Sequence, residues 1–163
     1  MTLSPQTKAR LALVSTFLVA IVLSIMPGPT WAEPFRPDWV GLVLVYWCIA
    51  APGRVGVGTG FVLGLAMDVL YGALLGSNAL VKSLLAFLAN RMHLRMRMFP
   101  RWQQAVAVML LLALDQLLVL WIRGAAGRAP ETLFYWTPSV VGMVIWPWLF
   151  VILRDVRRRA KIA

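Results

Sequence analysis

Three ionisable side chains lie inside otherwise apolar stretches of this sequence: Asp68, Lys82 and Asp115. A charge in the hydrocarbon interior of a membrane is costly, so such residues face a protein interior and pair with other groups. If the apolar stretches cross the membrane in alternating directions, both carboxylates lie about 20 Å from one membrane surface and Lys82 lies about 6 Å below the opposite surface. Either the three side chains form a polar cluster, or Lys82 extends alone to the surface while each aspartate bonds to neighbouring hydroxyls, amides or water.

Two carboxylates and a lysine can transfer protons, but the rest of the sequence offers no catalytic constellation. We find no nucleophile–base pair, no phosphate-binding glycine loop and no set of metal ligands. Cys48 is the single cysteine and His93 the single histidine, which excludes a disulfide framework and a cysteine-based metal site. We therefore expect no enzymatic activity, no cofactor and no bound metal.

A row of small residues surrounds the first of these aspartates. Every fourth position from 56 to 76 is occupied by Gly56, Gly60, Gly64, Asp68, Gly72 and Gly76. On a helix this spacing drifts by only about 40° per step, so the row forms one slowly turning stripe about 30 Å long. Small residues let membrane helices approach closely. The stripe predicts packing inside the bundle, which we favour, or docking of a partner's single helix; a chance register is the third alternative.

The composition identifies the class of protein. Of 163 residues, 61% are hydrophobic and 13% are charged, with a mean hydropathy of +0.79. Soluble domains carry about 25% charged residues, so we predict an all-α integral membrane protein. We expect residues 1–163 to form a single membrane domain, a six-helix bundle with spans at about 11–26, 37–51, 55–75, 78–90, 102–122 and 138–153.

The net charge of +10 is distributed as a topology signal rather than as a nucleic-acid-binding surface. With six spans, twelve basic residues fall on the side of both termini: Lys8, Arg10, Arg54, Arg91, Arg95, Arg97, Arg101 and the five in the C-terminal tail. The other side has three: Arg36, Arg123 and Arg128. This asymmetry predicts cytoplasmic termini and contacts with anionic lipids.

The segment from Arg91 to Arg101 is predicted as a cytoplasmic basic loop. Within it, Arg91, Arg95 and Arg97 belong to a strict alternation of basic and apolar residues. A period of two is not helical, so the segment can lie extended along the membrane with its methionines towards lipid. The alternative is a basic anchor whose alternation is accidental.

The residues Arg36-Pro37-Asp38-Trp39 form a motif before the second span. Asp38 is suited to cap the following helix, and Trp39 to anchor it at the membrane interface.

This motif is one of several whose order and spacing resemble the family of rod shape-determining protein MreD. The others are Tyr46-Trp47, the run from Gly58 to Leu65 with Asp68, Gly72 and Gly76, and Arg101-Trp102-Gln103-Gln104. The resemblance extends over nearly the whole chain.

The resemblance implies a non-catalytic scaffold of the cell-elongation machinery in the bacterial inner membrane. Its partners would be MreC, the actin-like MreB, RodA and a class B penicillin-binding transpeptidase. The family is also similar in fold to the substrate-binding subunits of energy-coupling-factor transporters. The alternative function is therefore a solute- or lipid-binding subunit of a transporter-like system, with a ligand pocket near Asp68 and Asp115.

Overall fold

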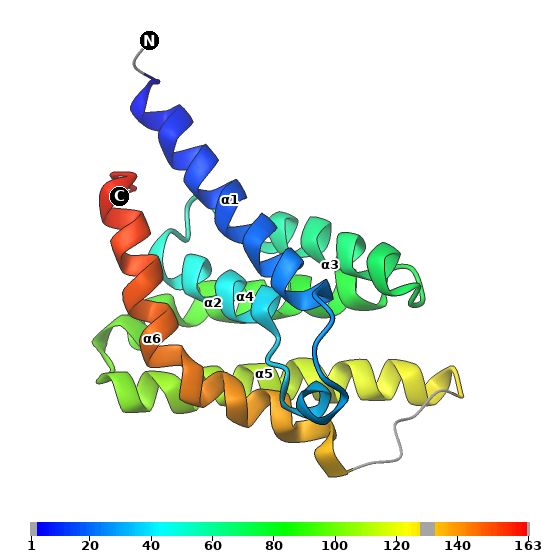
Figure 1. Ribbon diagram of the computed structural model, residues 1–163. Helices are drawn as coiled ribbons and strands as arrows, with labels where there is room; N and C mark the ends of the chain where they lie inside the picture. Colours follow the sequence, from blue (N-terminus) through cyan, green and yellow to red (C-terminus); the bar gives the residue numbers. More distant parts are fainter. Residues whose placement is uncertain (1–2, 128–132, 163) are drawn as a thin grey trace.

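A computed structural model describes residues 3–127 and 133–162, and this part of the chain is helical without strands. Arg128, counted above among the basic residues, lies outside the described residues. The described elements (Figure 1) are α1 (Pro5–Ile25), η1 (Thr30–Phe35), α2 (Trp39–Ala50), α3 (Val57–Tyr71), α4 (Ser77–Met98), α5 (Arg101–Ala125), η2 (Leu133–Trp136) and α6 (Thr137–Arg159).

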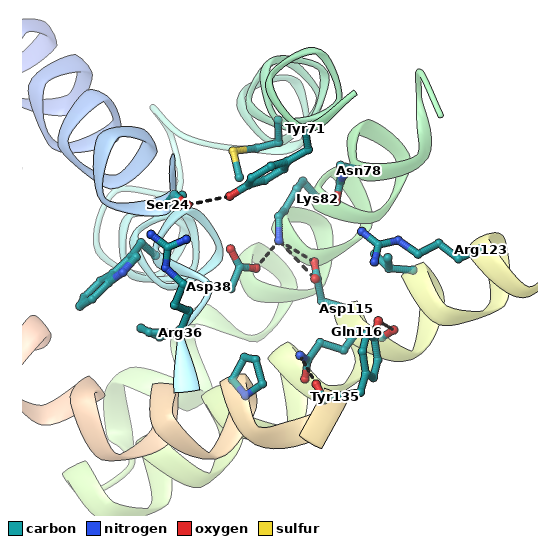
Figure 2. Close-up of a pocket in the computed structure, with 15 residues that line it drawn as sticks. Ser24, Arg36, Asp38, Tyr71, Asn78, Lys82, Asp115, Gln116, Arg123 and Tyr135 are labelled. Carbon is teal, nitrogen blue, oxygen red and sulfur yellow. Dashed lines mark hydrogen bonds and ion pairs between the residues drawn. The ribbon is translucent and has the colours of Figure 1, made fainter. Parts of the chain in front are cut away.

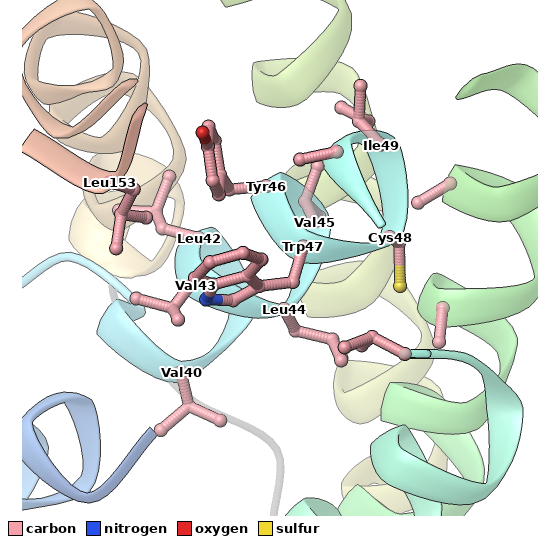
Figure 3. Packing of buried hydrophobic residues seen from close by; sticks show 14 of the residues in the cluster. Val40, Leu42, Val43, Leu44, Val45, Tyr46, Trp47, Cys48, Ile49 and Leu153 are labelled. Atoms are coloured by element: carbon pink, nitrogen blue, oxygen red, sulfur yellow. The ribbon is translucent and has the colours of Figure 1, made fainter. Parts of the chain in front are cut away.

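Helix α2 is the centre of the molecule. It packs against α1, α4, α5 and α6, while α3 pairs with α4 and α5 pairs with α6. Every residue from Val40 to Ala50 is buried, and Figure 3 shows their side chains projecting from all sides of the helix. A helix that is apolar all round belongs in a core. Its 12 residues span only about 18 Å, so α2 is shorter than a bilayer core is thick.

Among the described residues, three helices are long and apolar enough to cross a membrane: α1, α5 and α6. Helix α3 is a shorter apolar helix. The outward side chains of α1 include Leu11, Val14, Leu18 and Val22, all exposed, as expected of a face that meets lipid. These features fit a multi-pass membrane protein, and the helices differ in length more than the sequence predicted.

The prediction of a loop from Arg91 to Arg101 is wrong. Helix α4 continues through Arg91, Arg95 and Arg97 to Met98, and Arg101 already begins α5. Only Phe99 and Pro100 separate the two helices. Arginine and methionine are good helix formers, and that local propensity outweighs the period-two pattern.

The glycine stripe is also shorter than predicted. Helix α3 ends at Tyr71, and Gly72 and Gly76 adopt left-handed conformations with φ of 59° and 97°. Gly72 terminates α3 and Gly76 precedes α4, so neither extends the stripe along one helix face. Glycine adopts such φ values without the steric cost that other residues incur, which explains both positions.

Candidate functional site

Lys82 lies between two carboxylates in the interior of the bundle. Its ammonium Nζ donates to both oxygens of Asp115, at 3.0 and 3.2 Å, and also to Oδ2 of Asp38. Lys82 is 3% exposed and Asp115 5% exposed. The Asp38 side chain is 23% exposed, so this carboxylate forms the more accessible side of the cluster. One ammonium and two carboxylates leave the cluster with a net charge of −1.

The second partner of Lys82 is positioned by the start of α2. Asp38 is the N-cap of that helix, and its Oδ1 accepts from the Gly41 amide at 3.1 Å. A Cβ at Gly41 would lie 2.9 Å from the Asp38 Cγ, so glycine leaves room for the carboxylate. One carboxylate thus caps α2 with one oxygen and binds the lysine of α4 with the other.

Asp68 is not part of the lysine cluster that was one alternative from the sequence; it bonds to neighbouring amides and a hydroxyl, as the other alternative had it. It is 1% exposed and accepts from the Gly76 amide at 2.9 Å, both the amide and the side chain of Asn78 at 3.0 and 2.9 Å, the Ala79 amide at 3.3 Å and the Ser77 hydroxyl at 3.1 Å. These donors form the N-terminus of α4, where a helix presents free N–H groups and a positive dipole end. The aspartate of α3 therefore acts as the cap that Gly76 cannot provide.

The surviving part of the glycine stripe packs α3 against α4. A Cβ at Gly60 would lie 2.5 Å from the Lys82 carbonyl oxygen, and one at Gly64 would lie 2.5 Å from the Ala79 amide nitrogen. The two helix backbones are in direct contact at both glycines. This contact fixes the position of Lys82 along the α3–α4 pair. The same helix pair thus carries both the Asp68 network and the lysine of the Lys82 cluster.

A pocket of about 290 Å³ opens beside the lysine cluster (Figure 2). Residues of all six described α-helices, of the loop before α2 and of η2 contribute to it. Its polar lining residues are Ser24, Arg36, Asp38, Tyr71, Asn78, Lys82, Asp115, Gln116, Arg123 and Tyr135. Three cations thus face two carboxylates across the pocket, which gives its wall a net positive charge.

The walls of the pocket are cross-linked by hydrogen bonds. The Tyr71 hydroxyl donates to the Ser24 carbonyl at 3.0 Å and ties α3 to α1. The Tyr135 hydroxyl donates to the Gln116 carbonyl at 2.6 Å, and the Gln116 side chain donates back to the Tyr135 carbonyl at 2.9 Å. Burial raises the pKa of the Tyr135 hydroxyl, so this donor remains protonated at neutral pH. The pocket is therefore preformed.

All four residues of the Arg36-Pro37-Asp38-Trp39 motif line this pocket. The structure thus brings together the motif, Lys82 and Asp115, which are far apart in the sequence, and leaves Asp68 in its own network. Asp38 was not predicted as a partner of Lys82, because its suitability as a helix cap already accounted for an aspartate at that position. Gln116 and Tyr135 were also missed, because a neutral amide inside a span and a tyrosine before the next one do not by themselves indicate a shared site.

The charged groups of this site are largely occupied by one another. Both carboxylates that could act as bases are already bound to Lys82. In the described part of the chain, no group of three His, Cys, Asp or Glu side chains is arranged to hold a metal ion. What the pocket offers a ligand or partner is a rigid surface with two arginines, Arg36 and Arg123, near its two aromatic hydroxyls.

Comparison with known proteins identifies the family. The family model of rod shape-determining protein MreD matches residues 6–156. The chain is also 32% identical over 154 residues to the Rod shape-determining protein MreD of Haemophilus influenzae, covering 92% of this chain and 93% of that relative. No solved structure matches. The match includes all six α-helices almost completely and both acidic networks, and the chain belongs to the MreD family of rod shape-determining proteins.

Proposed function

We propose that this protein is a non-catalytic inner-membrane scaffold that maintains rod shape by linking MreC, MreB and the peptidoglycan synthases RodA and a class B penicillin-binding transpeptidase. Family membership supports the rod-shape role. The observation that supports a scaffold is the preformed pocket beside Lys82, whose charged walls are held by ion pairs and hydrogen bonds. A rigid recognition surface binds a partner with little loss of conformational entropy.

We further propose that all six helices cross the membrane, with both termini in the cytoplasm. The length of α2 is compatible with this arrangement, because each of its ends adjoins a polar pocket rather than lipid. Asp38 and Trp39 line the pocket described above, and Ile49 and Ala50 line another of about 240 Å³. A short helix is tolerated at membrane depth where its ends are enclosed by protein or open into water-filled cavities. Anionic lipids then surround the arginine-rich end.

The pocket beside Lys82 is, in this proposal, the contact for an elongation partner, MreC in the first instance. Arg36 and Arg123 are the residues with which to test it, since neither belongs to the described ion pairs. The test is affinity purification in mild detergent from the native bacterium, followed by mass spectrometry of proteins and lipids. We expect the Arg36→Gln/Arg123→Gln variant to recover at least tenfold less MreC. The control variant Arg91→Gln/Arg95→Gln loses the same charge at two exposed positions of the other end and should recover the normal amount.

Equal recovery of partners by both variants would contradict docking at this pocket. The second candidate function is a solute- or lipid-binding subunit similar to those of energy-coupling-factor transporters. The observation in its favour is the polar pocket with charged walls, although its volume of about 290 Å³ is just below the usual range and admits only a small ligand. Recovery of an ATPase module or of one stoichiometric ligand, without elongation proteins, would establish this alternative and overturn the scaffold.

A further inference from the structure

A second pocket with basic walls lies at the opposite end of α2. Its volume is about 240 Å³, and its lining includes Tyr46, Arg97, Gln104, Phe150 and Arg157. No carboxylate is among the described residues that line it. The pocket is formed where α2 and α4 end, where α5 begins and where α6 carries its terminal arginines. Under the proposed topology, this is the cytoplasmic headgroup level.

The arginines around this pocket are held in place but not neutralised. Arg97 donates from Nε to the Ile49 carbonyl at 2.9 Å and from Nη2 to the Ala50 carbonyl at 3.0 Å. These bonds use two of the five N–H groups of its guanidinium. Arg101 lies over the Phe150 ring, 5.5 Å from the centroid. Both side chains are therefore oriented by the protein and retain their positive charge.

Helix α6 adds two more arginines, one turn apart. Arg157 lines the pocket, and the buried Nε of Arg154 has no hydrogen-bond partner among the described residues. Both lie within electrostatic range of Tyr46, as does Asp155 between them, which is exposed. Both described ion pairs are formed by Lys82, so Asp155 neutralises neither arginine through a salt bridge. A buried guanidinium N–H without an acceptor is costly, and an external acceptor that reaches this end of α6 would remove that cost.

We propose that this pocket is a specific binding site for a phosphate group, with Arg157 and Arg97, which both line it, as the principal ligands and Arg154 adding positive charge from the adjacent turn of α6. A phosphate offers several acceptor oxygens and a charge that arginine forks match. Basic pockets between membrane helices on the cytoplasmic side suit lipid headgroups, so an anionic phospholipid is the expected source. The proposal rests on the anionic-lipid contact proposed above and gives it one defined location.

The test compares two pairs of substitutions on α6 with the same change of charge. Arg154→Gln/Arg157→Gln alters the pocket, whereas Arg158→Gln/Arg159→Gln alters exposed arginines of the same turn. The purified full-length protein in neutral detergent is titrated with phosphatidylglycerol, with phosphatidylcholine or with glycerol 1-phosphate, and binding is read by native mass spectrometry. Melting temperatures without ligand verify that each variant is folded, and Arg157→Gln alone serves if the pocket pair is unstable.

We expect phosphatidylglycerol to bind in preference to phosphatidylcholine, and its affinity to fall roughly thirty-fold in the pocket pair with little change in the control pair. Comparable binding of glycerol 1-phosphate, with the same dependence on the pocket pair, supports the phosphate site and assigns it to a soluble source. An equal loss of phosphatidylglycerol affinity in the pocket pair and in the control pair overturns the site and indicates a diffuse basic surface. Absence of any preference for phosphatidylglycerol overturns both the site and the lipid contact, while MreC recovery tests the scaffold separately.

Discussion

Replacement of Lys82 by methionine removes the cation that compensates two carboxylates. Asp115 is 5% exposed and would be left as a buried charge without its two bonds at 3.0 and 3.2 Å. Breaking a buried pair in this way costs about 3–5 kcal/mol. For a chain of this size, that loss lowers the melting temperature by about 6–20 °C. Thermal unfolding in detergent, followed by tryptophan fluorescence, measures it directly.

Two double variants determine whether this loss arises from the ion pair. Lys82→Met/Asp115→Asn removes the lysine and the carboxylate charge together. Its loss of unfolding free energy should therefore be smaller than the sum of the two single losses by more than about 1 kcal/mol. Lys82→Met/Asp68→Asn combines residues that share no hydrogen bond, and its effects should be closer to additive. A Lys82→Met protein that melts within 2 °C of the parent, or an additive Lys82–Asp115 pair, would refute the reasoning.

Three further predictions concern helix packing and capping. Gly64→Ala should lower the free energy of unfolding by about 1–3 kcal/mol, because the added Cβ pushes α3 away from α4. A Cβ at Gly58 would have nothing within 4 Å, so Gly58→Ala should be neutral or slightly stabilising. Similar melting temperatures of the two variants would contradict the contact. Asp68→Asn should cost about 2–3 kcal/mol and accelerate amide hydrogen exchange at the start of α4, and unchanged exchange there would exclude the cap. Gly41→Ala should cost about 1–3 kcal/mol by displacing the carboxylate of Asp38, and a crystal or cryo-EM structure with that carboxylate in place would disprove it.

The broad features of the fold followed from composition and apolar periodicity. Charge content and hydropathy predicted a helical membrane protein, and the helices lie near the predicted ranges. Their ends were less predictable, because capping depends on contacts between segments. The end of α3 at Tyr71 requires Gly72 in a left-handed conformation, and the start of α4 requires a carboxylate from α3.

The site could be predicted only in part. The cost of a charge in an apolar segment identified Lys82, Asp68 and Asp115 as residues that need partners. It could not assign the partners, because helices of similar depth can be rotated so that different faces meet. The Asp38 carboxylate approaches Lys82 from the loop before α2, a position that an argument restricted to helix depth does not consider.

The central position of α2 has a consequence for biogenesis. This helix precedes most of the chain that encloses it, since α4, α5 and α6 are all synthesised later. The carboxylate at its start has no lysine until α4 is made, and that lysine lacks its second partner until α5 is made. If α2 crosses the membrane as proposed, we expect this segment of 12 residues, too short to span the hydrocarbon core, to stay beside the insertion machinery until its neighbours emerge. The core of this protein is completed last, although its sequence is translated early.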